Sequence, residues 1–224
     1  AAAPSSATAA AATTATSTTI TTAPVYLPIT PKFRWAQGVV LSPDNAFFLV
    51  SDWSSTVKHV DTNTNTATRT YKRFDYPCGV DISPDTSFAL VADWNKGIGH
   101  IDLRTHQVSF PHLPYPKWGI SCPCGVAIYP DASFALFTNG DNNNIGRINL
   151  RTNQITFHYN DTGLNVPFGI AISPDSRHAV VSNCLGNNIA LTDLKTSLFR
   201  KFSTKVTFPF PKAGFNKPAG VPFS

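Results

Sequence analysis

The sequence has few charged residues, no methionine and no long apolar run. Asp, Glu, Lys and Arg make up 14% of its 224 residues, against roughly 25% in an ordinary globular domain. No run of about 18 apolar residues is present, so we expect no membrane-spanning helix. The net charge of +5 is mild, and the motifs of nucleic-acid-binding folds are absent, so we expect no nucleic-acid partner. Thr, Ser, Asn and Pro replace the missing charges, which favours a secreted all-β protein.

The signatures of catalysis are also missing. The sequence contains no nucleophile elbow, no phosphate-binding loop, no paired catalytic carboxylates and no histidine-rich metal set. The run Asp141-Asn142-Asn143-Asn144 suggests calcium, but it lacks the spaced carboxylates and the terminal Glu of a calcium loop. An extended turn is the favoured interpretation. We therefore expect no enzyme, no catalytic residue, no bound metal and no cofactor.

The N-terminal region differs in composition from the rest. Residues 1–24 consist of Ala, Thr, Ser and Pro around a single Ile20, and such a stretch cannot bury enough apolar surface to fold alone. Its composition is also typical of O-glycosylated stalks, with candidate sites at Thr13, Thr14, Thr16, Ser17, Thr18 and Thr19. Asn160 lies in the one N-glycosylation sequon. A first residue other than Met is typical of a processed end, so we expect an extracellular glycoprotein with a low-complexity segment over residues 1–35.

Residues 36–224 repeat themselves. The units align on glycines at Gly38, Gly79, Gly125 and Gly169, and a fifth start at Gly220 is cut short. Spacings of 41, 46, 44 and 51 residues, with several short strands per unit, are typical of propeller blades. In the second unit we expect strands at residues 80–83, 88–92, 98–103 and 108–110, with a turn at the Pro-Asp pair. The predicted fold is all-β, a β-propeller of four four-stranded blades.

Three motifs of the second unit carry a family resemblance: Pro-Cys-Gly-Val-Asp-Ile-Ser-Pro-Asp at 77–85, Phe-Ala-Leu-Val-Ala-Asp at 88–93 and Ile-Gly-His-Ile-Asp-Leu-Arg-Thr at 98–105. With them, residues 36–224 resemble the NHL-repeat and related YVTN-type propeller families. The resemblance implies strands that follow chain order outward from a central axis, and it leaves function open because such propellers serve as platforms, scaffolds and occasional enzymes. Two features depart from the family. The family usually forms more than four blades, and its glycine after Pro-Asp is here replaced by Asn45, Thr86, Ala132 or Ser176.

The four cysteines, Cys78, Cys122, Cys124 and Cys184, favour two disulfides, because they are an even number in a sequence with extracellular features. Cys78 and Cys124 precede the glycines of adjacent units, and Cys184 ends a second strand, which returns near the start of a first strand. We therefore predict the bridges Cys78–Cys122 and Cys124–Cys184 as staples between blades. The alternative is a metal or redox site at Cys-Pro-Cys, which lacks the two-residue spacer and a nearby histidine.

The ends of the second strands carry four equivalent pairs, Asp52-Trp53, Asp93-Trp94, Asn139-Gly140 and Asn183-Cys184. Turn capping by Asp or Asn, with the Trp packed at the rim, is the favoured interpretation. The alternative is a carbohydrate platform in which Trp53 and Trp94 are the binding candidates. His59 and His100 are also equivalent, but they lie on third strands, away from the axis, so a surface role is favoured over metal binding.

Both ends of the repeat region suggest unpaired edges. Residues 18–22 precede Gly38 at about the spacing of a fourth strand, and residues 220–224 begin a fifth unit. Donated strands join sheet proteins, and a donation that does not close generates a filament. The assembly candidates are Ile20, Val25, Tyr26 and Leu27. We expect a structural subunit of an extracellular filament with copies of itself as partners, or alternatively a secreted glycan- or protein-binding module.

Overall fold

The computed structural model describes residues 32–111, 119–158 and 163–194 of the chain. Over these residues it contains fifteen β-strands and no helix. Accordingly, no described segment forms a helix long and apolar enough to cross a membrane. The predicted all-β fold is confirmed for the described part of the chain.

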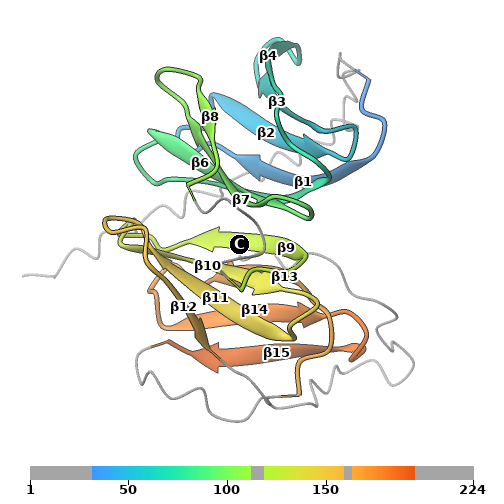
Figure 1. The fold of residues 1–224 in the computed structure, drawn as a ribbon. Coiled ribbons are helices and arrows are strands. Elements are labelled where there is room, and N and C mark those ends of the chain that lie inside the picture. The colour runs from blue at the N-terminus through green and yellow to red at the C-terminus, as the bar shows by residue number, and fades with distance from the viewer. Residues whose placement is uncertain (1–31, 112–118, 159–162, 195–224) are drawn as a thin grey trace, which may run out of the picture.

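The strands form four antiparallel sheets, each built from strands that are consecutive in the chain (Figure 1). The first sheet contains β1 (Ala36–Leu41), β2 (Phe47–Asp52), β3 (Thr56–Asp61) and β4 (Ala67–Tyr71). The second contains β5 (Pro77–Ile82), β6 (Phe88–Asp93), β7 (Gly97–Asp102) and β8 (Val108–Ser109). The third contains β9 (Pro123–Ile128), β10 (Phe134–Asn139), β11 (Asn144–Asn149) and β12 (Ile155–His158). The fourth contains β13 (Pro167–Ile172), β14 (His178–Asn183) and β15 (Asn188–Asp193), and residues 195–224 lie outside the described residues.

The predicted four-stranded meander is confirmed in the first three sheets, with one correction at the strand starts. Sequence reasoning began each unit at its glycine, whereas β5, β9 and β13 begin two residues earlier, at Pro77, Pro123 and Pro167. Proline is tolerated at the first residue of a strand because its missing N–H leaves no ladder hydrogen bond unmade there. Cys78 and Cys124 therefore lie within strands rather than in the loops before them.

The turns between first and second strands have the chemistry predicted for the Pro-Asp pair. The serine before the proline donates its hydroxyl to the aspartate carboxylate, at 2.6 Å for Ser42 and Asp44 and at 2.7 Å for Ser83 and Asp85. The following residue has a φ between 54° and 59° in every unit, at Asn45, Thr86, Ala132 and Ser176. This left-handed conformation favours glycine over residues that carry a Cβ, yet none of the four units has a glycine at this position.

Adjacent sheets pack face to face through three apolar clusters. In the first cluster, Leu49 and Val57 of the first sheet contact Val80, Ile82 and Val91 of the second. The second cluster joins the second and third sheets in the same way, through Leu90, Ile98, Val126, Ile128 and Phe137. The third cluster joins the third and fourth sheets, through Leu136, Ile145, Ile170 and Val181. Each sheet is too thin to cover its own apolar faces, so the stability of each depends on its neighbours.

The first strands of successive sheets lie side by side, β1 beside β5, β5 beside β9 and β9 beside β13. A Cβ atom on Gly79 would lie 2.6 Å from the carbonyl oxygen of Cys124, and one on Gly125 would lie 2.5 Å from that of Phe168. No side chain fits at either distance. The repeated glycine is therefore required because two backbones approach each other there.

The four sheets form an open series in the described part of the chain. In Figure 1 the first and second sheets form the upper half of the molecule and the third and fourth sheets form the lower half, and neither β13 nor β14 packs against β1 to the extent that β5 and β9 pack against their neighbours. The arrangement is propeller-like, because successive sheets are stacked face to face. Within each sheet the strands follow chain order outward from the first strand. Because the series does not close on itself, the first and fourth sheets each have an outer face.

Candidate functional site

The carboxylate or amide that ends each second strand holds the chain segment that enters the same sheet. Asp52 accepts the backbone N–H groups of Arg34 at 2.9 Å and Trp35 at 3.1 Å. Asp93 accepts that of Asp75 at 2.6 Å. Asn139 and Asn183 accept those of Ser121 and Asn165, both at 2.5 Å. The predicted turn capping is confirmed for Asp52 and Asp93, which also accept backbone N–H groups of the turns that follow them, from Ser54 and from Asn95 and Lys96.

The two aspartates of this set differ in their electrostatics. Burial alone would raise the pKa of Asp52, but N–H donors from Ser54, Arg34 and Trp35 outweigh it and hold the pKa at about 2. Lys58 adds an ion pair at 3.5 Å. At Asp93, burial dominates over the backbone donors and raises the pKa to about 6. The same position therefore carries a carboxylate whose ionised form is stabilised in the first sheet and one whose ionised form is destabilised by burial in the second sheet.

An aromatic groove lies at the rim between the first two sheets. It has a volume of about 240 Å³ and is lined by Trp53, Tyr76, Trp94 and Asn95. The rings of Trp53 and Tyr76 meet edge to face, with centroids 5.8 Å apart, and Tyr76 is 44% exposed. The two tryptophans that sequence reasoning selected are thus brought together.

Tyr76 was missed by sequence reasoning, although a signal for it exists. It lies three residues before Gly79, where the other units have Trp35, Cys122 and Val166. Its carbonyl oxygen accepts the backbone N–H of Trp94 at 3.1 Å, and that of Trp35 accepts the N–H of Trp53 at the same distance. The residue at this position therefore always lies beside the residue after the second strand.

No disulfide bond joins Cys78, Cys122, Cys124 or Cys184 in this structure. The Cys78 and Cys124 side chains are neighbours, and the indole N–H of Trp53 donates to Cys78 Sγ at 3.3 Å. The Cys122 thiol donates to Asp141 Oδ2 at 2.8 Å. The contact between Cys78 and Cys124 was not anticipated from the sequence, and the bridges Cys78–Cys122 and Cys124–Cys184 stay predictions.

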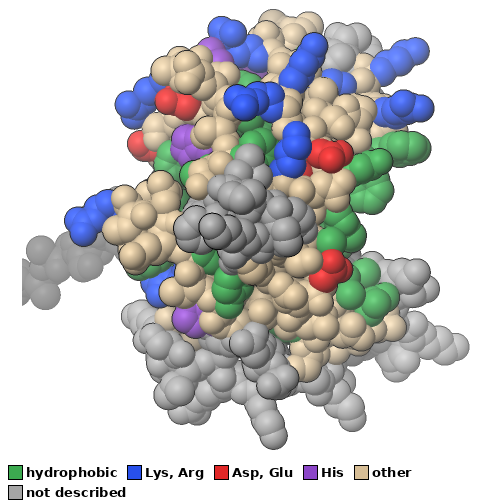
Figure 2. Space-filling model, viewed as in Figure 1, with side chains coloured by type: hydrophobic (Ala, Val, Ile, Leu, Met, Phe, Trp, Pro, Cys, Tyr) green, Lys and Arg blue, Asp and Glu red, His purple; other side chains and the backbone are tan. Residues whose placement is uncertain are grey.

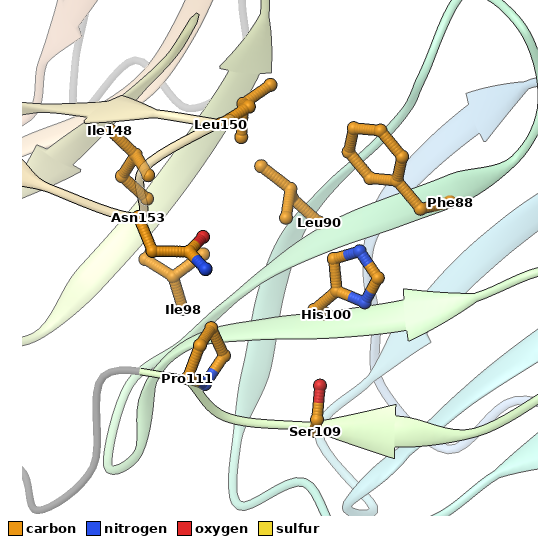
Figure 3. A pocket seen from close by; sticks show the side chains of 9 residues that line it. All are labelled: Phe88, Leu90, Ile98, His100, Ser109, Pro111, Ile148, Leu150 and Asn153. Atoms are coloured by element: carbon orange, nitrogen blue, oxygen red, sulfur yellow. The ribbon is translucent and has the colours of Figure 1, made fainter.

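A second cavity, of about 370 Å³, lies between the second and third sheets (Figure 3). Phe88, Leu90 and Ile98 of the second sheet face Ile148 and Leu150 across it. Its walls are mainly apolar; the polar lining residues are His100, Ser109 and Asn153. The cavity can hold an apolar group, and it offers no set of groups that could activate one.

The histidines pack as parts of the sheet surface. His59 stacks on Phe47 with centroids 4.1 Å apart, and His100 stacks on Phe88 at 5.1 Å. Burial lowers the pKa of both imidazoles. Among residues 32–111, 119–158 and 163–194, no three His, Cys, Asp or Glu side chains are grouped so that they could hold a metal ion.

The asparagine-rich run after the third sheet's second strand forms a turn. Asn142 Nδ2 donates to the carbonyl oxygen of Gly119 at 2.9 Å, and Asn143 Oδ1 accepts the backbone N–H of Val166 at 2.8 Å. These side chains are used to hold neighbouring backbone. The interpretation of this run as an extended turn is confirmed.

The outer faces of the series expose side chains that are buried elsewhere in the repeat. The first outer face carries Val39 and Leu41 on β1, which are 70% and 50% exposed. Their equivalents in the second sheet, Val80 and Ile82, are 7% and 6% exposed because the first sheet covers them. In Figure 2, hydrophobic side chains reach the surface along the right-hand edge of the molecule.

The fourth sheet has its outer face on the opposite side of the series. The second outer face carries Val180 on β14 and Leu191 on β15, which lie opposite each other in the register. Leu191 is 51% exposed and Val180 is half-buried. The equivalents of Val180 in the first three sheets, Leu49, Leu90 and Leu136, are buried in the three clusters.

Several residues selected from the sequence lie outside the described residues. These are the glycosylation candidates Thr13, Thr14, Thr16, Ser17, Thr18, Thr19 and Asn160, and the assembly candidates Ile20, Val25, Tyr26 and Leu27. The boundary between residues 1–35 and 36–224 stays a prediction.

Comparisons with known proteins support the fold. Neither a protein family nor a curated protein matches the sequence. Hydrazine synthase of Kuenenia stuttgartiensis is structurally similar, with a TM-score of 0.62 and 20% sequence identity over 75% of this chain. The match covers 48% of the hydrazine synthase chain, so this chain spans about half its length. Since 1532 solved chains share the fold, the likeness describes an architecture that many functions use.

Proposed function

We propose that this chain is a structural subunit that joins head to tail with copies of itself into an extracellular filament. The observation that carries the proposal is the pair of outer faces. Val39 and Leu41 are exposed at a repeat position that the preceding sheet buries in the second and third units, and Leu191 is exposed on the other side of the series.

The two outer faces correspond to the two faces that pack together at each internal junction. At each of the three internal junctions, the face that carries Val80 or its equivalent packs against the face that carries Leu49 or its equivalent. The first outer face carries Val39, the equivalent of Val80, and the second outer face carries Val180, the equivalent of Leu49. Packing one copy's fourth sheet against the next copy's first sheet would therefore repeat an existing junction. Such a contact is heterologous, and it propagates unless its rotation closes a ring.

Burial would also make the contact favourable. Removing a Val or Leu side chain from water contributes about 1.5–3 kcal/mol, and at least Val39, Leu41 and Leu191 would be covered. The N-terminal segment belongs to the same proposal as a strand donor to the neighbouring copy, through Ile20, Val25, Tyr26 and Leu27. Extracellular location and glycosylation are supported by the Thr/Ser-rich residues 1–24. Membership of the NHL-repeat or YVTN-type families is supported by the four aligned repeat units.

Electron microscopy of the full chain tests the proposal, with light scattering to measure its mass. We expect elongated assemblies that disappear in the Val39→Lys/Leu41→Lys variant, because two ammonium groups cannot be buried in an apolar contact. Asn63→Lys, in the exposed β3–β4 turn, is the control and should assemble normally. A discrete monomer of 24.2 kDa at every concentration would overturn the proposal.

The aromatic groove supports a second candidate, a secreted module that binds a glycan. Trp53, Tyr76 and Trp94 offer ring faces and edges, and Asn95 offers an amide, which suits the apolar faces and hydroxyls of a sugar ring. A glycan array with the full chain tests it. Trp94→Ala should abolish binding, while Trp35→Ala, which removes an exposed tryptophan that does not line the groove, should leave it unchanged. An array without signal removes this candidate and leaves the filament proposal standing.

A further inference from the structure

The junction between the second and third sheets is built differently from the other two. At the first junction, Ser51 Oγ accepts the N–H of Gly38 at 2.9 Å and donates across to the carbonyl oxygen of Cys78. At the third, Thr138 Oγ1 accepts the N–H of Gly125 at 2.7 Å and donates to Phe168 O at 2.8 Å. The equivalent residue of the second sheet is Ala92, which has no hydroxyl. The second junction therefore lacks this bridge.

A pair of thiols occupies that junction instead. Cys78 and Cys124 directly precede Gly79 and Gly125, whose backbones approach so closely that a Cβ on Gly79 would lie 3.0 Å from Gly125 Cα. Both cysteines lie on first strands that run side by side, and both are buried. Disulfides form between cysteines whose Cα atoms lie about 4.4–6.8 Å apart, and the close approach of the two first strands at Gly79 and Gly125 favours a bridge between the residues directly before them.

The surroundings give the two sulfurs different roles. Trp53 Nε1 donates a hydrogen bond to Cys78 Sγ at 3.3 Å, and the neighbouring Cys124 side chain and this indole lower the pKa of Cys78 despite its burial. The Cys124 thiol instead donates to the carbonyl oxygen of Cys122 at 3.7 Å, and the neighbouring Cys78 together with burial raises the pKa of Cys124. Cys78 is therefore the nucleophile, since the thiolate is the reactive form, and Cys124 keeps the proton until it reacts.

We propose that Cys78 and Cys124 are a redox pair that hydrogen peroxide oxidises to a disulfide, locking the second sheet to the third. The Cys78 thiolate attacks one peroxide oxygen, the O–O bond breaks, hydroxide leaves and Cys78 becomes a sulfenic acid. The Cys124 sulfur then attacks Cys78 Sγ and displaces the hydroxyl group, which leaves with the Cys124 proton as water. Two thiols and one peroxide thus give one disulfide and two waters.

The size of the oxidant follows from the burial of the pair. Cys78 and Cys124 are 1% and 2% exposed, so a small oxidant suits the site better than a bulky disulfide. Trp53 contacts Cys78 Sγ and also lines the aromatic groove, so we expect peroxide to approach from the groove. The proposal is independent of whether the chain forms filaments, because both sulfurs lie inside one copy.

Peptide mapping of the oxidised full chain tests the pairing. After peroxide treatment, the chain is denatured, its remaining thiols are alkylated, and trypsin is added without reductant. Cys78 lies in the tryptic peptide 74–96, Cys122 and Cys124 share the peptide 118–147, and Cys184 lies in another. We expect a link between the first two peptides, with alkyl groups on Cys122 and Cys184. Fragmentation of the linked peptide then identifies Cys124 as the bonded residue without any substitution.

Two variants sharpen the assignment. Cys122→Ser should keep the linked peptide, and Cys124→Ser should abolish it. Three results after peroxide treatment would each overturn the proposal. The first is a disulfide from Cys78 to Cys122 with Cys124 alkylated, the second is a disulfide to the peptide that contains Cys184, and the third is complete alkylation of Cys78. The wild-type map decides the matter even if a variant fails to fold.

Discussion

The first and second sheets have nearly the same sequence motif and opposite surroundings. Val39 and Leu41 of β1 face outward, whereas Val80 and Ile82 of β5 are covered by the first sheet. Asp52 is held ionised by backbone donors and a lysine, whereas Asp93 is buried among groups that compensate it poorly. The repeat therefore determines where the strands and turns lie, while the neighbouring sheet determines whether a side chain is buried and whether its charged form is stabilised.

The largest expected difference lies in the side chains of the two first strands. Ile82→Ala removes a buried side chain and should lower the free energy of unfolding by about 2–5 kcal/mol. Leu41→Ala, at the equivalent exposed position, should change it by about 0.5 kcal/mol or less. Urea unfolding at a protein concentration where the chain is monomeric measures both. Equal losses would show that something in the monomer already covers the first outer face.

The aspartates that end β2 and β6 should give opposite pH dependences. The pKa of Asp93 rises to about 6 on folding from about 3.9 in the unfolded chain, so the folded state binds its proton more tightly. The stability from Asp93 is full below pH 4 and is lost as the pH rises through 6. The loss at pH 7 is about 3 kcal/mol, at 1.36 kcal/mol per pKa unit.

Asn at this position accepts the same backbone N–H in the third and fourth sheets, so substitution keeps the cap. Asp93→Asn should raise stability at pH 7 and reduce its fall between pH 4 and 6. Asp81, whose pKa burial also raises to about 6, supplies the remaining slope. Asp52→Asn should instead lower stability at pH 7, because the folded pKa of Asp52 is depressed and its stabilisation is lost only as the pH falls from 4 through 2. Chemical unfolding across this pH range separates the two, and identical profiles for both variants would contradict the contrast.

A hydroxyl placed in the second sheet should make its junction resemble the first. In Ala92→Ser the new Oγ would lie between Gly79 N–H and the carbonyl oxygen of Cys124, as Ser51 Oγ lies between Gly38 and Cys78. We expect a gain of about 1 kcal/mol in urea unfolding under reducing conditions. Ala89→Ser, in the apolar first cluster, is the control and should lose stability. A loss in Ala92→Ser as large as in the control would mean that the two junctions are not equivalent.

The smallest expected effect concerns the turn that every sheet shares. Ala132 has a φ of 54°, a conformation that is unfavourable by about 1–2 kcal/mol for residues with a Cβ. Ala132→Gly should therefore raise stability, by about 0.5 kcal/mol once the larger entropy loss of glycine is included. Ala127→Gly, in the buried strand β9, should lower it. Thermal unfolding compares the pair, and a loss at both positions would contradict the reading of the turn.

Sequence reasoning predicted the features that repeat and missed those that depend on neighbours. The glycines, the Pro-Asp turns and the caps at Asp52 and Asp93 recur in register, so the sheets could be predicted from them. Val39 and Leu41 are matched by the apolar Val80 and Ile82, so the apolar positions of the repeat did not distinguish an outer face from a junction. The contact of Cys78 with Cys124 depends on how closely the first strands approach, which spacing along the chain does not report.

The most direct test of the account is whether the first outer face of one copy meets the second outer face of another. A Leu41→Cys/Leu191→Cys chain, with Cys122 and Cys184 changed to Ser, is treated with a short bis-maleimide and separated by denaturing electrophoresis. The account predicts a ladder of multiples of 24.2 kDa, with at most dimers from either single cysteine variant. A cross-link that forms only within one chain, or none at all, would contradict head-to-tail assembly through these faces.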